Sequence, residues 1–201
     1  MTRILLISGS TRETSLHTAA LRTAARFAPA GITATLFEGL RTLPAFVPGD
    51  QDPPDVTDLR RRAAAADALL FTTPEYAGSL PGSLKNLLDW LIEGGDLNGK
   101  PTAWLSVSPP AQDDGARTAL ETVLGHGNSR LLRAACIRVP LGPEAVGADG
   151  LIADARLHMA LLDMLQALAR ILTIPPPQAA PTWQAQSSLY PMVLRRRDSG
   201  A

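Results

Sequence analysis

Short, uninterrupted apolar runs alternate with helix-like segments along most of the chain, and this alternation limits the possible folds more than any other feature. The run Ile4-Leu5-Leu6-Ile7 is too short for a helix and is closed by Gly9, so it predicts a buried strand over 3–8. Comparable runs predict four more strands, at 32–37, 68–73, 102–107 and 134–139. Strands buried on both faces and separated by helices form parallel sheets, so we expect an α/β fold with helices on both faces.

A helical pattern of apolar residues follows each predicted strand. In the first of these helices Leu16, Ala20 and Ala24 share one face; the helix is expected to begin at Ser15 and to stop before Pro29. Further helices are predicted at about 55–66, 80–91, 115–125 and 153–172. The sequence therefore contains five β-α units.

One domain is expected over 1–173, because no internal repeat or linker divides that stretch. The segment 174–201 contains Pro175-Pro176-Pro177 and has no clear periodicity, and it predicts a Pro-rich C-terminal tail. This composition is compatible with three alternatives: the segment packs as an extended arm, pairs with a neighbouring subunit, or forms a partly ordered terminus.

Composition excludes several classes of function. Lys plus Arg and Asp plus Glu both number 19, so no overall charge attracts nucleic acid or an anionic membrane. No apolar stretch approaches the roughly 20 residues of a membrane-spanning helix. The single Cys136 cannot form an intramolecular disulfide, and no secretory leader follows Met1, so a cytoplasmic location is expected. No motif indicates a metal site, a P-loop or a classical dinucleotide domain.

The loop after the first strand, Gly9-Ser10-Thr11-Arg12-Glu13-Thr14-Ser15, predicts a phosphate site. A turn that leads into a helix presents free backbone amides and the positive end of the helix dipole. The Ser and Thr hydroxyls add donors, and the Arg12 guanidinium can bind phosphate oxygens bidentately. The alternative is that Ser15 only caps the helix and Arg12 is an exposed cation.

The loop after the third strand, residues 74–82, predicts a platform for a flat ligand. Gly78 and Gly82 remove the Cβ obstruction, so the backbone can approach such a ligand closely, and Tyr76 can flank it. In a doubly wound sheet the loops after the first and third strands flank the ligand crevice, so the pair predicts a flavin mononucleotide (FMN) site. The alternative is that Ser79 and Pro81 only start the helix and Tyr76 is a surface aromatic.

These two loops resemble those of the NADPH-dependent FMN reductase family of flavodoxin-like proteins, which includes azo-dye, quinone and chromate reductases. The family's first loop reads approximately G-S-x-R-x-x-S-x-N, and residues 9–17 read GSTRETSLH. Its second loop reads approximately P-E-Y-N-x-S-x-P-G-x-L-K-N-x-x-D-W, and residues 74–90 read PEYAGSLPGSLKNLLDW. The resemblance covers roughly 1–173. It implies a flavodoxin-like three-layer sandwich with a five-stranded parallel sheet in the order 2-1-3-4-5.

The resemblance also implies bound FMN, NADPH or NADH as co-substrate, and a homodimer or homotetramer. The cofactor-binding residues that we expect are Gly9, Ser10, Arg12, Ser15, His17, Pro74, Glu75, Tyr76, Ala77, Gly78 and Ser108. Among them Ser10, Arg12 and Ser15 would hold the phosphate, and the isoalloxazine ring would be lined by Pro74, Glu75, Tyr76 and Gly78. Lys85, Asn86, Asp89 and Trp90 would be structural or subunit-contact positions.

Three departures from the family pattern fall in these loops. His17 replaces an Asn, and its imidazole can still donate a hydrogen bond. Ala77 replaces another Asn and removes a side-chain donor and acceptor. The loop after the fourth strand is glycine-rich in the family, whereas residues 106–117 read SVSPPAQDDGAR. Two prolines and two aspartates are expected to stiffen this loop and to bring negative charge close to the ligand.

The expected activity is a ping-pong oxidoreduction, in which a hydride passes from NAD(P)H to FMN and the electrons then pass to a small acceptor such as a flavin, quinone, azo compound or metal oxyanion. No catalytic side chain is required, because the chemistry belongs to the cofactor. Two alternatives stay open: a flavin-binding or flavin-free interaction protein without efficient turnover, and an electron carrier. The second is less compatible with the charged Arg12 in the phosphate loop.

Overall fold

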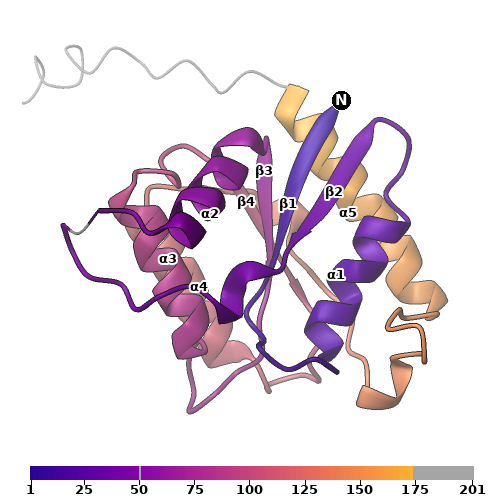
Figure 1. The fold of residues 1–201 in the computed structure, drawn as a ribbon. Coiled ribbons are helices and arrows are strands. Elements are labelled where there is room, and N and C mark those ends of the chain that lie inside the picture. Colours follow the sequence, from indigo (N-terminus) through magenta and orange to yellow (C-terminus); the bar gives the residue numbers. More distant parts are fainter. Residues whose placement is uncertain (50, 174–201) are drawn as a thin grey trace, which may run out of the picture.

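A computed structural model describes residues 1–49 and 51–173, and the predicted tail 174–201 lies outside the described residues. The sheet is parallel, with the strand order β2-β1-β3-β4-β5 and with β6 paired to β4 (Figure 1). Its strands are β1 (Thr2–Ser8), β2 (Ile32–Phe37), β3 (Ala68–Thr72), β4 (Pro101–Ser106), β5 (Arg130–Leu131) and β6 (Ile137–Arg138). The helices are α1 (Leu16–Arg26), α2 (Pro54–Ala65), α3 (Gly82–Glu93), α4 (Asp114–His126) and α5 (Ala155–Thr173), with short 3₁₀ turns η1 (Gly39–Arg41), η2 (Arg133–Ala135) and η3 (Pro143–Ala145). The predicted α/β architecture and strand order are confirmed.

The fifth predicted strand, at 134–139, differs in detail. Two short strands occupy this edge of the sheet instead, β5 and β6, and η2 separates them. Both pair with β4, and the Leu132 amide also donates to the Thr102 carbonyl at 2.8 Å. The Cys136 amide turns back to the Arg133 carbonyl at 3.1 Å, so the chain bulges out of the ladder between the two strands. An edge strand has a partner on one side only, and such a bulge is tolerated there.

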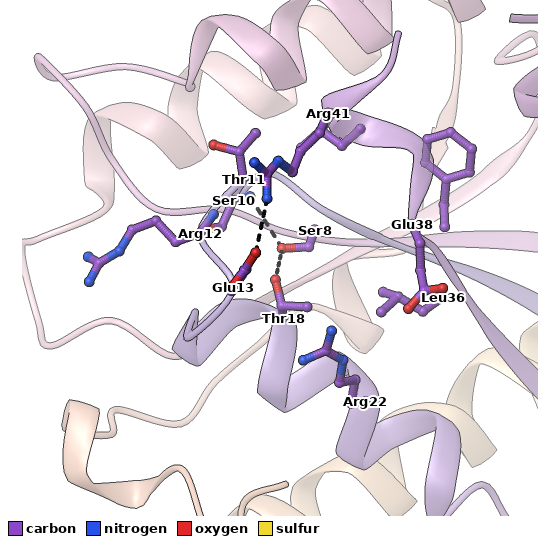
Figure 2. A pocket seen from close by; sticks show the side chains of 12 residues that line it. Ser8, Ser10, Thr11, Arg12, Glu13, Thr18, Arg22, Leu36, Glu38 and Arg41 are labelled. Carbon is purple, nitrogen blue, oxygen red and sulfur yellow. Dashed lines mark hydrogen bonds and ion pairs between the residues drawn. The ribbon is translucent and has the colours of Figure 1, made fainter. Parts of the chain in front are cut away.

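The carboxyl ends of β1, β3 and β4 each carry a buried hydroxyl residue. Ser8 ends β1 and pairs in register with Thr72 at the end of β3, and Ser106 ends β4. The Ser8 hydroxyl lies 2.8 Å from the Thr18 hydroxyl on α1, as Figure 2 shows. This is the edge where an open α/β sheet binds ligands. The edge is thus polar although the strands themselves are apolar.

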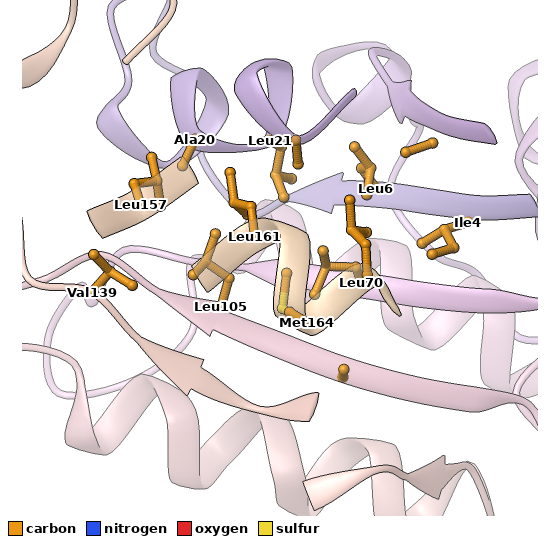
Figure 3. Packing of buried hydrophobic residues seen from close by; sticks show 14 of the residues in the cluster. Ile4, Leu6, Ala20, Leu21, Leu70, Leu105, Val139, Leu157, Leu161 and Met164 are labelled. Carbon is orange, nitrogen blue, oxygen red and sulfur yellow. The ribbon is translucent and has the colours of Figure 1, made fainter. Parts of the chain in front are cut away.

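Alternate residues of β1 divide the core into two clusters. Ile4 and Leu6 belong to the cluster under α1 and α5, and Figure 3 shows Leu6 near Leu21 and Leu161. Leu5 and Ile7 face the opposite side, in the cluster under α2, α3 and α4. A strand directs successive side chains to opposite faces, and helices cover both faces here, so the run must be apolar throughout. None of the helices in the described part of the chain is long and apolar enough to cross a membrane.

Candidate cofactor site

Gly9 begins the first loop at a point of very close packing. Its amide donates to the Thr72 carbonyl at 2.7 Å, which holds the loop against the end of β3. A Cβ at Gly9 would lie 2.5 Å from Thr73 Oγ1 and 2.8 Å from Leu84 Cδ2. Such distances leave no room for a methyl group, so only glycine allows the loop to pass this close to the third strand.

The start of α1 is prepared to bind an anion. The Ser15 hydroxyl caps the helix by accepting the Thr18 amide at 3.3 Å, and Ser15 itself is buried. The cap leaves the first amides of the helix, those of Leu16 and His17, without an intrahelical partner at the positive end of the helix dipole. The hydroxyl group of Ser10 lies in the loop ahead of these amides and also accepts the Arg12 amide at 3.3 Å.

A cavity of about 200 Å³ lies between this loop and the end of β2. Its lining includes Ser10, Thr11, Arg12 and Arg41 (Figure 2). Arg41 reaches across the cavity to Glu13, with Nη1 and Oε1 3.5 Å apart, whereas the Arg12 guanidinium extends away from Arg41 into the open. Arg12 is exposed and is therefore available to a phosphate bound at the loop.

The second loop is a tight hairpin turn. The Tyr76 amide donates to the Ser79 carbonyl and the Ser79 amide donates to the Tyr76 carbonyl, both at 3.0 Å. Ala77 and Gly78, the two central residues, have φ of 51° and 71°, and positive φ at both central positions is the mark of a type I′ turn. Asn-Gly is the preferred pair in such a turn. The Asn that Ala77 replaces in the family pattern therefore suits the turn, and here alanine carries the left-handed conformation.

Tyr76 stands at the rim of this loop with 49 % of its surface exposed, as expected for a side chain that flanks a ligand. Glu75 has a structural role beside the ring contact that its place in the motif predicts. Its carboxylate oxygen Oε2 accepts the Ala116 amide of α4 at 2.9 Å, so it caps the start of that helix. Gly115 packs directly on the Gly78 carbonyl. The second loop and the start of α4 thus form one packed unit.

The loop after β4 turns one of its two aspartates inward. Asp113 is buried, with 4 % of its surface exposed, and accepts a hydrogen bond from the Ser106 hydroxyl. Asp114 is exposed and pairs with Arg117 and Arg138. Ser108 is half-buried at the beginning of the loop. The expected negative charge is therefore placed beneath the crevice by Asp113, while Asp114 is neutralised at the surface.

His17 points into the protein rather than toward the phosphate loop. Its Nδ1 lies 3.0 Å from the Thr72 hydroxyl. Burial lowers the pKa of His17 to about 4, and the nearby Asp113 carboxylate opposes this shift only in part. The imidazole is therefore neutral at pH 7. The sequence had suggested a possible donor at the phosphate, but the side chain bonds to the third strand, and only its backbone amide lies at the helix start.

Comparisons with known proteins bear on this site. The model of the NADPH-dependent FMN reductase family matches residues 2–140. The chain belongs to that family. It is 33 % identical over 175 residues to an NAD(P)H-dependent FMN reductase of Pseudomonas aeruginosa, covering 83 % of this chain and 92 % of the relative. It is 32 % identical over 105 residues to a quinone reductase of Escherichia coli, which is 49 % of this chain and 56 % of that protein.

Solved structures give the same assignment. The flavoenzyme NAD(P)H:(acceptor) oxidoreductase FerB from Paracoccus denitrificans superposes with a TM-score of 0.74 at 26 % identity, over 86 % of this chain and 97 % of that one. Family membership makes the protein an oxidoreductase with FMN as cofactor and NAD(P)H as co-substrate, which confirms those predictions. The residues described above fit FMN, because the amides at the start of α1 and the exposed Arg12 are free to bind its phosphate beside the closely packed Gly9.

Sequence reasoning did not single out the buried polar residues beneath the crevice. Thr72, Ser106 and Asp113 are all less than 5 % exposed. The sequence contains an indication of Thr72 and Ser106, because these hydroxyl residues lie at the ends of the apolar runs of the third and fourth strands. Asp113 had no such signal: its pattern in the sequence is the same as that of Asp114, and only the tertiary structure distinguishes them.

Proposed function

We propose that this protein oxidises NAD(P)H by passing a hydride to bound FMN and then reduces a small acceptor, a quinone or a free flavin, at the same face of the cofactor. The observation that carries the proposal is the pair of loops at the carboxyl edge of the sheet. One of them is built for a phosphate around Gly9 and Arg12, and the other exposes Tyr76 beside a glycine turn.

FMN, when bound, supplies the redox chemistry by accepting a hydride and returning two electrons to the acceptor. Over a full cycle NAD(P)H gives up a hydride, which is two electrons and one proton, and solvent gives a second proton. The acceptor therefore gains two electrons and two protons. The residues of the chain bind FMN and orient it. Arg12, the hydroxyl of Ser10 and the first amides of α1 would hold the phosphate, and backbone amides of the turn at Ala77 and Gly78 would bind the ring.

The acceptor class is supported by the relatives. One relative is named as an FMN reductase, and others, of which the chain covers about 60 % of the length, are named as quinone reductases. If both substrates use the same face of the bound FMN, NAD(P)+ must leave before the acceptor enters, and we therefore expect a ping-pong order. The homodimer or homotetramer and the cytoplasmic location stay predictions.

The proposal is tested with the purified full-length protein. Addition of FMN is expected to raise the melting temperature, and anaerobic addition of NADPH or NADH is expected to bleach the flavin absorbance near the visible maximum. Initial rates measured at several quinone concentrations should give parallel double-reciprocal lines. A protein that binds FMN but is not bleached by either nicotinamide would contradict the proposal and favour a flavin-binding protein without turnover; one that shows no thermal shift with FMN would favour a flavin-free interaction protein.

The phosphate half of the proposal has its own test. Arg12→Gln is expected to weaken FMN binding by about 10- to 100-fold, because a charge-assisted hydrogen bond contributes about 1.5–3 kcal/mol. Quenching of flavin fluorescence on titration gives the dissociation constant. Arg26→Gln, on the last turn of α1 and also exposed, is the matched control and should bind FMN as the wild type does. Equal affinity in the two variants would remove Arg12 from the site.

A further inference from the structure

A buried polar cluster lies at the carboxyl edge of the sheet, and the proposed contacts to the cofactor make no use of it. We call it the strand-end cluster; it consists of His17, Thr72, Ser106 and Asp113. Thr72 bonds to His17 Nδ1 at 3.0 Å, and the Ser106 hydroxyl donates to the Asp113 carboxylate. All four residues are at most 9 % exposed. Buried polar groups cost free energy unless they are paired, so a cluster of four at the ligand-binding edge indicates a function.

The cluster joins two of the departures from the family pattern. His17 replaces an Asn after the first strand, and Asp113 lies in the loop that is glycine-rich in relatives. Nothing in the sequence around either residue connects the two positions. In the structure Thr72, Ser106 and Asp113 line one small crevice, and the His17 imidazole bonds to Thr72 at its side. The two changes therefore form a single local unit and not two independent losses.

The charge of this unit is negative. His17 is neutral at pH 7 because burial lowers its pKa to about 4, and its neighbour Thr72 from β3 is also neutral. Ser106 from β4 donates a hydrogen bond but brings no charge. Arg117 of α4 lines the same small crevice as Asp113, but its guanidinium pairs with the exposed Asp114 and lies over the Trp104 ring, 5.1 Å from the centroid. Asp113 thus places a buried negative charge at the end of β4, two residues before Gly115, which packs on the Gly78 carbonyl of the second loop.

We propose that the Asp113 carboxylate, oriented by Ser106, lowers the two-electron reduction potential of the bound FMN. This inference rests on the proposed function, because it requires FMN in the crevice. Reduction adds negative charge to the ring, and a fixed carboxylate at low dielectric raises the free energy of that state more than the free energy of the oxidised state. Asp113 is a positioning residue in this scheme: it acts on the cofactor through its charge and takes no part in hydride transfer.

The decisive experiment compares Asp113→Asn with Asp114→Asn. Each change removes one negative charge, and the two positions are adjacent in the sequence. Only Asp113 is buried. The midpoint potential of bound FMN is measured by anaerobic spectrophotometric titration against a reference dye. In Asp113→Asn the affinity for reduced relative to oxidised FMN is expected to rise at least tenfold, which is about 30 mV for a two-electron couple. In Asp114→Asn it is expected to stay at the wild-type value.

Further variants separate charge from structure. Asp113→Glu keeps the charge and should retain a low potential, whereas a role in packing alone would leave Glu and Asn equally altered. If Asp113→Asn does not fold, Asp113→Gly follows the glycine-rich pattern of the family's loop, removes the same charge and should show the same positive shift. Equal potentials in the charge-removing variants and in Asp114→Asn would overturn the inference. A wild-type protein that does not bind FMN would instead contradict the proposed function, so the two failures are distinguishable.

Discussion

The carboxylate of Glu75 accepts a hydrogen bond from the Ala116 amide at 2.9 Å, and this bond helps to hold the second loop against the start of α4. Glu75→Ala is expected to lower the free energy of unfolding by about 1 kcal/mol, because it removes a helix cap and a favourable charge at the helix N-terminus. Urea denaturation measures the change. Glu13→Ala is the control: its ion pair with Arg41 is exposed, so it should change stability by less than about 0.5 kcal/mol. Equal costs in both variants would contradict the capping role.

Two glycines in the site region should respond in opposite ways to the same substitution. Gly9→Ala places a methyl group 2.5 Å from Thr73 Oγ1, so it is expected to destabilise the protein by about 1–3 kcal/mol and to weaken FMN binding. Gly82→Ala, in the first turn of α3, meets no atom within 4 Å and is expected to be neutral or stabilising by up to about 1 kcal/mol. Thermal melts with and without FMN measure both effects. A tolerated alanine at position 9 would show that the loop is not held against the third strand.

Ala77 carries a backbone conformation that alanine disfavours. Its φ of 51° lies in the left-handed region, which costs an ordinary residue about 1–2 kcal/mol and costs Asn less. Ala77→Asn is therefore expected to raise stability by up to about 1 kcal/mol. Ala64→Asn, the same chemical change at an exposed helical position, should lower stability by up to about 0.7 kcal/mol. Chemical denaturation of the pair gives the two signs, and a loss of stability in both would argue against the left-handed turn.

Burial of neutral His17 predicts a pH dependence of stability. The unfolded imidazole titrates near 6.5 and the folded one near 4, so the unfolded state binds the proton first as the pH falls. The contribution of neutral His17 to the free energy of unfolding is therefore fully present above pH 6.5 and is lost as the pH falls toward 4. It amounts to roughly 3 kcal/mol. His17→Asn should remove this part of the pH dependence when denaturation curves at pH 7, 5.5 and 4.5 are compared. His126→Asn, at an exposed position on α4, should leave it as in the wild type.

The architecture could be predicted because it depends on local patterns. The run Ile4 to Ile7 is apolar at every position, which is the signature of a strand covered on both faces, and Ser15 caps the first helix at the position that its spacing suggests. The fifth strand was less predictable. Its residues are as apolar as those of a continuous strand, but the bulge at η2 depends on pairing with β4, which the local sequence does not encode.

The sequence by itself determined where the first four strands and the two loops at the carboxyl edge lie along the chain, because glycines, hydroxyls and apolar runs act over a few neighbouring residues. The order of the strands followed only from the resemblance of those loops to a known family. Only the tertiary structure decided what the side chains in those loops do. Glu75 turns to α4, His17 turns to the third strand, and Asp113 is buried while Asp114 is not. The reason is physical: a polar side chain takes the partner that folding brings within hydrogen-bonding distance, and these partners lie far away along the chain.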